Sequence, residues 1–250
     1  MKSRYLFTLF LIINVLFFSC GLDTFYSLEP PVRTKNVPSY DTELLYNYFH
    51  FYTNDAANKL MQGFKYRGTE VYYRIYANYQ IIEEREDLIL DLNNSTNYLA
   101  AIERLKSYKY QPLHTKEYGS DLSPLISVDN ALNSQEIEIR LSKNPNYSPF
   151  SVPYIKKNGT VFATPVRCVD TTDGYLTFDF AETDESILNR IPSDGDEDYE
   201  SGSFSDSYPN TYFVDLYAVA VGQDSTFTNY YSKVLHLGTV RISATDSSNN

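Results

Sequence analysis

Basic residues are scarce in this sequence: 21 Lys and Arg stand against 32 Asp and Glu, which gives a net charge of −11 at pH 7. A body this acidic repels nucleic acids and anionic lipid surfaces. Tryptophan is absent, and the three histidines are far apart, without the His-x-x-x-His spacing that binds a metal. We therefore expect no nucleic-acid partner and no histidine metal centre.

Catalytic signatures are missing as well. The sequence contains no Gly-x-Ser-x-Gly elbow, no phosphate-binding glycine loop and no dinucleotide fingerprint. Cys168 has no histidine motif nearby, which favours a buried, inert thiol over a nucleophile. The sequence thus identifies no catalytic residue and no cofactor, and we expect a protein that is not an enzyme.

No apolar run is long enough to span a membrane. The most apolar stretch, residues 5–18, contains two polar residues and is shorter than the roughly 20 residues of a spanning helix. It follows two basic residues and ends at the small residue Ser19. This order of charged start, short apolar middle and small residue predicts a secretory signal peptide over residues 1–19.

Cys20, the residue after the predicted signal peptide, indicates which kind of signal peptide this is. Ser19-Cys20 resembles the processing box of bacterial lipoproteins, in a relaxed form with Phe17 and Phe18 that is typical of spirochaete lipoproteins. The resemblance implies that Cys20 carries the acyl chains, such as palmitate, and that they hold the protein on a membrane of the cell envelope. Cys168 then has no disulfide partner. Two points stay open: which membrane face carries the protein, and whether this is an ordinary signal with a chance cysteine.

Strand patterns dominate the rest of the chain. Residues 20–39 contain three prolines without a hydrophobic period and predict a tether. Aromatic runs and alternation predict strands at 44–52, 70–76, 136–141, 152–157, 160–169, 175–180, 212–221 and 234–242, with a hairpin turn at Asn158-Gly159. Residues 53–69 and 222–233 are expected to be loops, and residues 243–250 a frayed tail.

The spacing of the apolar residues changes from that of a strand to that of a helix between about residues 80 and 112. Apolar residues recur there at helical spacing in two stripes, the first Ile81, Ile82, Leu88, Ile89 and Leu92, the second Tyr98, Leu99, Ile102 and Leu105. This predicts two helices between Ile81 and Tyr108, an αα insertion in a domain of residues 40–242.

Strands without regular strand–helix alternation predict a mainly β fold, an antiparallel β-sandwich that carries this insertion. Residues 213–220 and 231–234 resemble the closing strands of a fibronectin type III-like domain, although the tryptophan common in that family is missing. We prefer a single elaborated sandwich, because no Pro/Gly-rich linker divides residues 117–135. Two small β domains are the alternative.

The most distinctive polar segment is an acidic loop at about residues 182–208. Asp194, Asp196 and Asp198 have the one-three-five spacing of calcium loops. Tyr199 stands where such loops need glycine, and Ser205 stands in place of the bidentate glutamate. The segment is therefore expected to be a solvated, mobile loop, with calcium as a weak candidate and no metal site assigned.

The pattern as a whole favours a lipid-anchored envelope protein that serves as a non-catalytic binding or structural module for a protein or a glycan. One alternative is an exported hydrolase with scattered acidic residues, which needs a cleft holding two carboxylates. The other is a solute-binding lipoprotein, which usually consists of two α/β lobes. The partners expected are thus the membrane, through Cys20, and a protein or glycan ligand.

Overall fold

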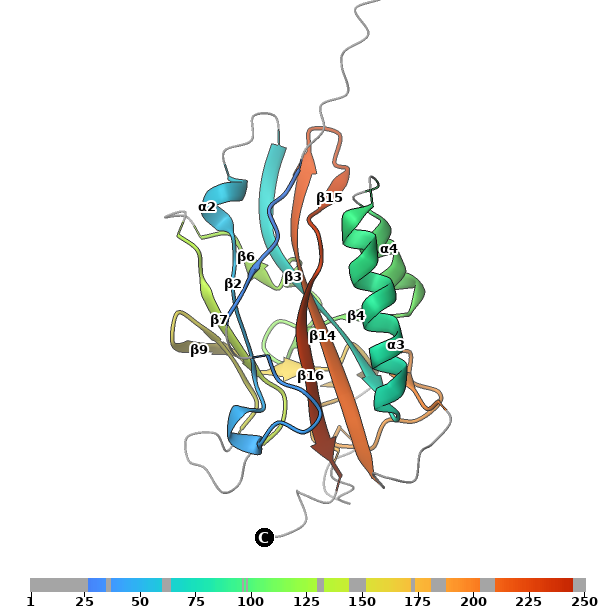
Figure 1. The fold of residues 1–250 in the computed structure, drawn as a ribbon. Helices are drawn as coiled ribbons and strands as arrows, with labels where there is room; N and C mark the ends of the chain where they lie inside the picture. The colour runs from blue at the N-terminus through green and yellow to red at the C-terminus, as the bar shows by residue number, and fades with distance from the viewer. Residues whose placement is uncertain are drawn as a thin grey trace, which may run out of the picture.

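The computed structural model describes residues 27–34, 37–59, 64–95, 97, 99–129, 133–143, 152–171, 174–180, 188–202 and 210–244. Strands dominate, and antiparallel sheets pack face to face (Figure 1), so the predicted mainly β sandwich is confirmed. The signal peptide, Cys20 and residues 245–250 lie outside the described residues. The likeness to fibronectin domains stays a prediction.

One sheet is organised by two long strands. β3 (Phe64–Tyr76) and β14 (Thr211–Asp224) pair antiparallel, from Phe64 opposite Asp224 to Tyr76 opposite Phe213. β16 (Leu235–Ser243) and β15 (Asn229–Tyr231) lie along the outer edge of β14. The outer edge of β3 is covered by three short strands, β4 (Gln111–Pro112), β6 (Ile126–Ser127) and the parallel β13 (Tyr199–Glu200). We call this the long-strand sheet.

The second sheet has five antiparallel strands. Their order is β1 (Val32–Arg33), β2 (Phe49–Tyr52), β7 (Glu136–Arg140), β8 (Tyr154–Lys157) and β9 (Thr160–Ala163). Two small ribbons complete the strands, β5 (His114–Thr115) with β10 (Pro165–Val166) and β11 (Asp170–Thr171) with β12 (Gly174–Tyr175).

Two helices cover the outer face of the long-strand sheet (Figure 1), so the molecule has three layers. They are α3 (Tyr79–Leu90) and α4 (Ala100–Ser107), joined through the 3-10 turn η2 (Asp91–Asn94). They match the two predicted helices, although α3 begins at Tyr79, two residues before the predicted start at Ile81. The side chain of Asn78 caps α3 by accepting a hydrogen bond from the Gln80 amide at 2.9 Å. In the described ranges, no helix combines the length and the apolar character needed to cross a bilayer.

The period-two alternation of β3 divides the core. Val71, Tyr73 and Ile75 face the five-stranded sheet, whereas Tyr72 and Tyr76 face the helices. The strand is therefore buried on both faces, which explains its nearly continuous run of aromatic and β-branched residues.

Several predicted boundaries are wrong. The segment predicted as a strand over 44–52 begins with the 3-10 turn η1 (Leu44–Tyr46), and one helical turn, α2 (Asp55–Asn58), lies outside the predicted helical region. Of residues 175–180, only Tyr175 is in a strand. Leu176, Phe178 and Phe180 alternate along this segment and are buried, but the segment is not part of a β-sheet. Their alternation therefore indicates burial and not a strand.

Two predicted loops contain strand. β3 begins at Phe64, and β15 lies in the second loop. Gly68 led to the loop prediction for residues 53–69. It has φ +140° and lies beside a register shift at which β3 has one more residue than β14. A Cβ there would approach the carbonyl oxygen of Ile126 to 2.0 Å, so this glycine permits a bulge and a close strand contact and does not mark a loop.

Part of the segment predicted as a tether packs on the sandwich. Leu28 is buried, and the backbone N–H and C=O of Glu29 pair with the Asn58 side chain at 2.7 and 2.8 Å. The carbonyl of Pro38 accepts a hydrogen bond from the Thr239 amide at 2.9 Å. Residues 27–34 and 37–39 thus pack on the sandwich, because the chain supplies polar and apolar partners that proline content alone does not reveal.

Candidate functional site: a groove beside the edge of the long-strand sheet

A groove of about 500 Å³ lies where the short strands β4 and β6 meet the outer edge of β3. Residues 113–125, which include β5, connect these two strands. The polar residues that line the groove are Glu70, Lys106, Gln111, His114, Ser120 and Ser123, and the apolar ones include Pro112, Leu113, Leu122 and Leu125. A groove with apolar walls and a few polar groups has the general character of a binding site.

Glu70 contributes the negative charge. Its carboxylate accepts hydrogen bonds from the Tyr72 hydroxyl at 2.5 Å and from the Ser123 hydroxyl at 3.4 Å. Burial, together with the charge of Glu70, raises the pKa of Tyr72, so this hydroxyl stays protonated and keeps donating. The carboxylate is thereby held in position while Glu70 itself is half-buried.

Lys106, in the last turn of α4, contributes the positive charge. Its side chain is exposed, and its ammonium lies 4.7 Å from the centre of the Tyr231 ring. The groove therefore presents a cation from the helix layer and a carboxylate from the sheet.

His114 adds a neutral polar group. Burial lowers the pKa of its imidazole, and its ring lies edge-on to Tyr175 at 5.4 Å between centroids. Its Nδ1 is buried and has no hydrogen-bond partner among the described residues. His114 thus adds an uncharged ring to the lining of the groove, and no motif in the sequence predicts this placement.

A second hollow, of about 420 Å³, is lined by residues that form ion pairs. Arg85 binds Glu200 with two hydrogen bonds, at 2.6 and 2.7 Å, and Arg74 lies 3.2 Å from the same carboxylate. Burial alone would raise the pKa of Glu200, but the hydrogen bonds and charges of the two arginines lower it overall. The carboxylate is thus fixed as an anion, which does not suit a general acid.

Where the structure describes the acidic segment, at residues 188–202, two of its carboxylates are buried and not solvated as predicted; the rest of the predicted loop lies outside the described residues. Asp198 is fully buried and Asp196 nearly so, and both bind the buried guanidinium of Arg167. The contacts run from Nε to Asp198 at 2.8 Å and from Nη2 to Asp196 and Asp198 at 2.7 Å each. Tyr73 also donates to Asp198, at 2.5 Å. The prediction was wrong here because Arg167, the partner, lies about thirty residues earlier in the chain.

These contacts bear on the calcium candidate. Asp196 and Asp198 use their oxygens on arginines, whereas Asp194 is exposed and lines the second hollow. In the part of the chain that the structure describes, no three His, Cys, Asp or Glu side chains converge as metal ligands. The one-three-five spacing therefore does not bring the three carboxylates together.

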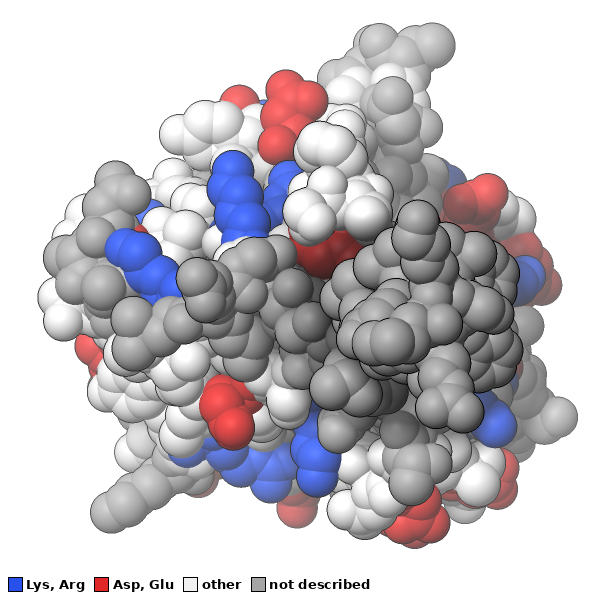
Figure 2. Space-filling view, turned by 90° about the horizontal axis from the view of Figure 1, so that it is seen from above, with Lys and Arg blue, Asp and Glu red and all other residues white. Residues whose placement is uncertain are grey.

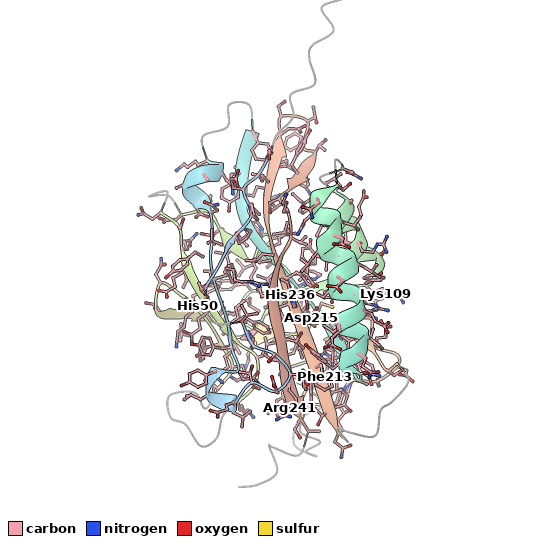
Figure 3. All side chains as sticks on the ribbon, viewed as in Figure 1. His50, Lys109, Phe213, Asp215, His236 and Arg241 are labelled. Atoms are coloured by element: carbon pink, nitrogen blue, oxygen red, sulfur yellow. The ribbon has the colours of Figure 1, made fainter. Side chains whose placement is uncertain are left out.

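A second buried cluster joins α3 to the long-strand sheet. Asp215 and His236 lie next to each other in the long-strand sheet (Figure 3). The fully buried Asp215 accepts from His236 Nε2 at 2.7 Å, from the Thr239 hydroxyl at 2.8 Å and from the Tyr110 hydroxyl at 2.5 Å. The other imidazole nitrogen lies 2.7 Å from Glu86. Burial would lower the pKa of His236, but the two carboxylates raise it to about 9, so the ring is an imidazolium at neutral pH.

The other residues named from the sequence have structural contacts. His50 lies between the Thr34 hydroxyl and the Glu136 carboxylate, each at 2.8 Å. Burial raises the pKa of the Cys168 thiol to about 11, so it is protonated at neutral pH, and its amide donates to the Tyr73 hydroxyl at 2.7 Å. Neither residue takes part in the groove.

No protein-family model matches this chain, and neither a curated protein nor a solved structure matches it. Its function therefore has to be inferred from its own residues.

Proposed function

We propose that this chain is a lipid-anchored protein of a bacterial cell envelope and that its β-sandwich binds a segment of another protein in the groove. The observation that carries the binding role is the groove itself, in which Glu70 and Lys106 bring opposite charges to apolar walls. The signal-like start and Ser19-Cys20 support the anchor.

The groove chemistry favours a peptide over a sugar. Sugars are commonly bound against exposed aromatic ring faces, whereas Tyr72 and Tyr110, which line the groove, are only 6% and 3% exposed. A peptide segment with an apolar side chain and both charges would match the apolar walls, Lys106 and Glu70 together. We therefore place a protein segment before a glycan.

The same geometry favours binding over hydrolysis. A glycoside hydrolase needs two carboxylates about 5–9.5 Å apart across its substrate. Among the described residues that line the groove, Glu70 is the only carboxylate. The second hollow is lined by Asp194 and Glu200, but Arg85 holds Glu200 as an anion, which does not suit the acid of such a pair. The solute-binding alternative is disfavoured by the mainly β architecture.

The anchor is tested by metabolic labelling with a palmitate analogue in a bacterial host. Replacing Cys20 with Ala should abolish the label and move the protein from the detergent phase to the aqueous phase, because its acyl chains would be lost. Cys168→Ala is the matched control and should keep both properties. Unchanged labelling of the Cys20→Ala protein would refute the anchor.

The groove is tested by selecting displayed peptides against the wild-type protein. The double variant Glu70→Gln/Lys106→Gln should lose most of the binding, because both charges are gone while the apolar walls stay. Glu103→Gln/Lys233→Gln removes the same two charges at exposed positions that do not line the groove, and it should bind normally. Equal binding by the two double variants would contradict the proposal, and so would binding of glycans alone in a parallel glycan array.

A further inference from the structure

The hairpin between β14 and β15 presents an aromatic ring to solvent. Phe227 is 80% exposed, more than any other large apolar residue in the described part of the chain. Its backbone has φ +66°, a left-handed conformation that is a genuine outlier for a bulky residue. An exposed phenylalanine in a disfavoured conformation has no benefit for the isolated fold.

The tip that carries this ring is well ordered by hydrogen bonds. The carboxylate of Asp224 accepts from the amides of Thr226 at 2.8 Å and Thr228 at 2.9 Å, and the amide of Phe227 donates to the Asp224 carbonyl at 3.2 Å. Tyr230 also donates to this carboxylate, at 3.2 Å. The ring thus projects from a fixed turn.

The first packed residues of the chain lie at the same end of the molecule (Figure 1). Leu28 packs in a small cluster with Phe64, Tyr66 and Ala220, against which Tyr230 of β15 also packs. Leu28 is eight positions after Cys20 in the sequence (28 − 20 = 8). Even a fully extended chain of that length spans no more than about 29 Å, so an acylated Cys20 holds this end of the sandwich close to the bilayer.

We infer that the hairpin tip at Phe227 inserts into the surface of the membrane to which Cys20 is anchored, and so fixes the orientation of the sandwich. This inference rests on the proposed acylation of Cys20. Burial of the exposed ring among lipid groups supplies a reason for its exposure in the free protein. Where described residues are visible from this end, Lys and Arg side chains lie near Asp and Glu side chains among uncharged ones (Figure 2), so this part of the surface is not uniformly acidic.

The absence of tryptophan makes the test direct. Phe227→Trp and, separately, Tyr46→Trp each introduce the only tryptophan of the chain. Tyr46 is 50% exposed in η1, at the opposite end of the molecule (Figure 1), and is the matched control. Each full-length variant is expressed in a bacterial host, extracted from its membranes and reconstituted in phosphatidylcholine vesicles with brominated acyl chains, which quench tryptophan on contact.

Flotation of the protein with the vesicles shows whether the acyl anchor holds it on the membrane. Quenching of the tryptophan emission shows whether the substituted residue contacts the acyl chains. We expect both variants to float, the Phe227→Trp protein to lose more than half of its emission and the Tyr46→Trp protein to lose almost none. Floating protein in which neither tryptophan is quenched, or both are quenched equally, would overturn the tip contact and leave the anchor standing. Protein that does not float would refute the anchor, and the tip inference would fall with it.

Discussion

Two buried charge clusters lie on opposite faces of the long-strand sheet. Each pairs a buried aspartate with a cation, which is an arginine in one cluster and a histidine in the other. On the sandwich side, Arg167 is held by Asp196 and Asp198. On the helix side, His236 is held by Asp215 and Glu86. In each cluster a tyrosine hydroxyl donates to the aspartate at 2.5 Å, from Tyr73 or Tyr110. The guanidinium keeps its charge at any pH the fold survives, whereas the imidazolium can lose its proton.

Each cluster attaches a different part of the chain to the long-strand sheet. The arginine cluster attaches the acidic segment around β13 to the edge of β3, through a cation that is permanently charged. The histidine cluster attaches α3 to β14 and β16, through a cation that titrates. We therefore expect the first attachment to be nearly independent of pH in the neutral and alkaline range and the second to weaken as pH rises.

The largest expected effect is on the arginine cluster. Asp198→Asn leaves the fully buried Arg167 with half of its counter-charge, and breaking a buried pair from one side costs about 3–5 kcal/mol in the free energy of unfolding. Urea unfolding followed by circular dichroism measures it. The control Asp194→Asn, at an exposed carboxylate, should change stability by less than about 0.5 kcal/mol. Equal stability of the two variants would mean that the acidic segment is solvated after all.

The next effect concerns the pH dependence from the histidine cluster. The pKa of His236 is about 9 in the folded protein, against about 6.5 when the chain is unfolded, so folding is favoured by up to about 3 kcal/mol while the ring is protonated. This contribution is fully present below about pH 6.5 and is lost as pH rises to about 9. Stability of the wild type should therefore fall across this window. His236→Gln should show a much flatter profile, and an equally steep one would assign the fall to other groups.

A smaller effect separates the two tyrosines. Tyr110→Phe removes one hydrogen bond to a charged group, which is worth about 1.5–3 kcal/mol, and leaves Asp215 with His236 and Thr239. Tyr73→Phe removes the corresponding bond to Asp198 and also leaves the Cys168 amide without its acceptor. We expect Tyr73→Phe to be the more destabilising variant in the same urea assay, with the exposed Tyr118→Phe as the control near zero. The reverse order would show that the helix-side cluster is the tighter one.

The sequence predicted those features that depend on local pattern. Alternation and helical period identified the sandwich class, the helices and most strands, because burial on one face leaves a regular signal. Both clusters were missed because they depend on long-range pairing. Arg167 reaches residues about thirty positions away, and Glu86 meets His236 from a different layer. Asp215, a charge inside an otherwise apolar strand, is the local signal that could have indicated a buried network. The groove was missed for the same reason, since Glu70, Lys106 and His114 come from three separate elements.

The smallest effect is expected for an ion pair that is partly exposed, and it measures how strongly burial determines the contribution of an ion pair to stability. Asp196 is bound by two arginines, Arg167 with no exposed side-chain area and Arg190 with 40% exposed. Because solvent screens the outer pair and its long side chain loses entropy on pairing, Arg190→Gln should cost less than about 1 kcal/mol. Raising the salt concentration should shrink this cost further, whereas the cost of Asp198→Asn should change little, since buried pairs are screened much less. Urea unfolding of both variants at low and high sodium chloride measures the difference. A loss for Arg190→Gln as large as that for Asp198→Asn would show that the outer arginine also holds the acidic segment on the fold.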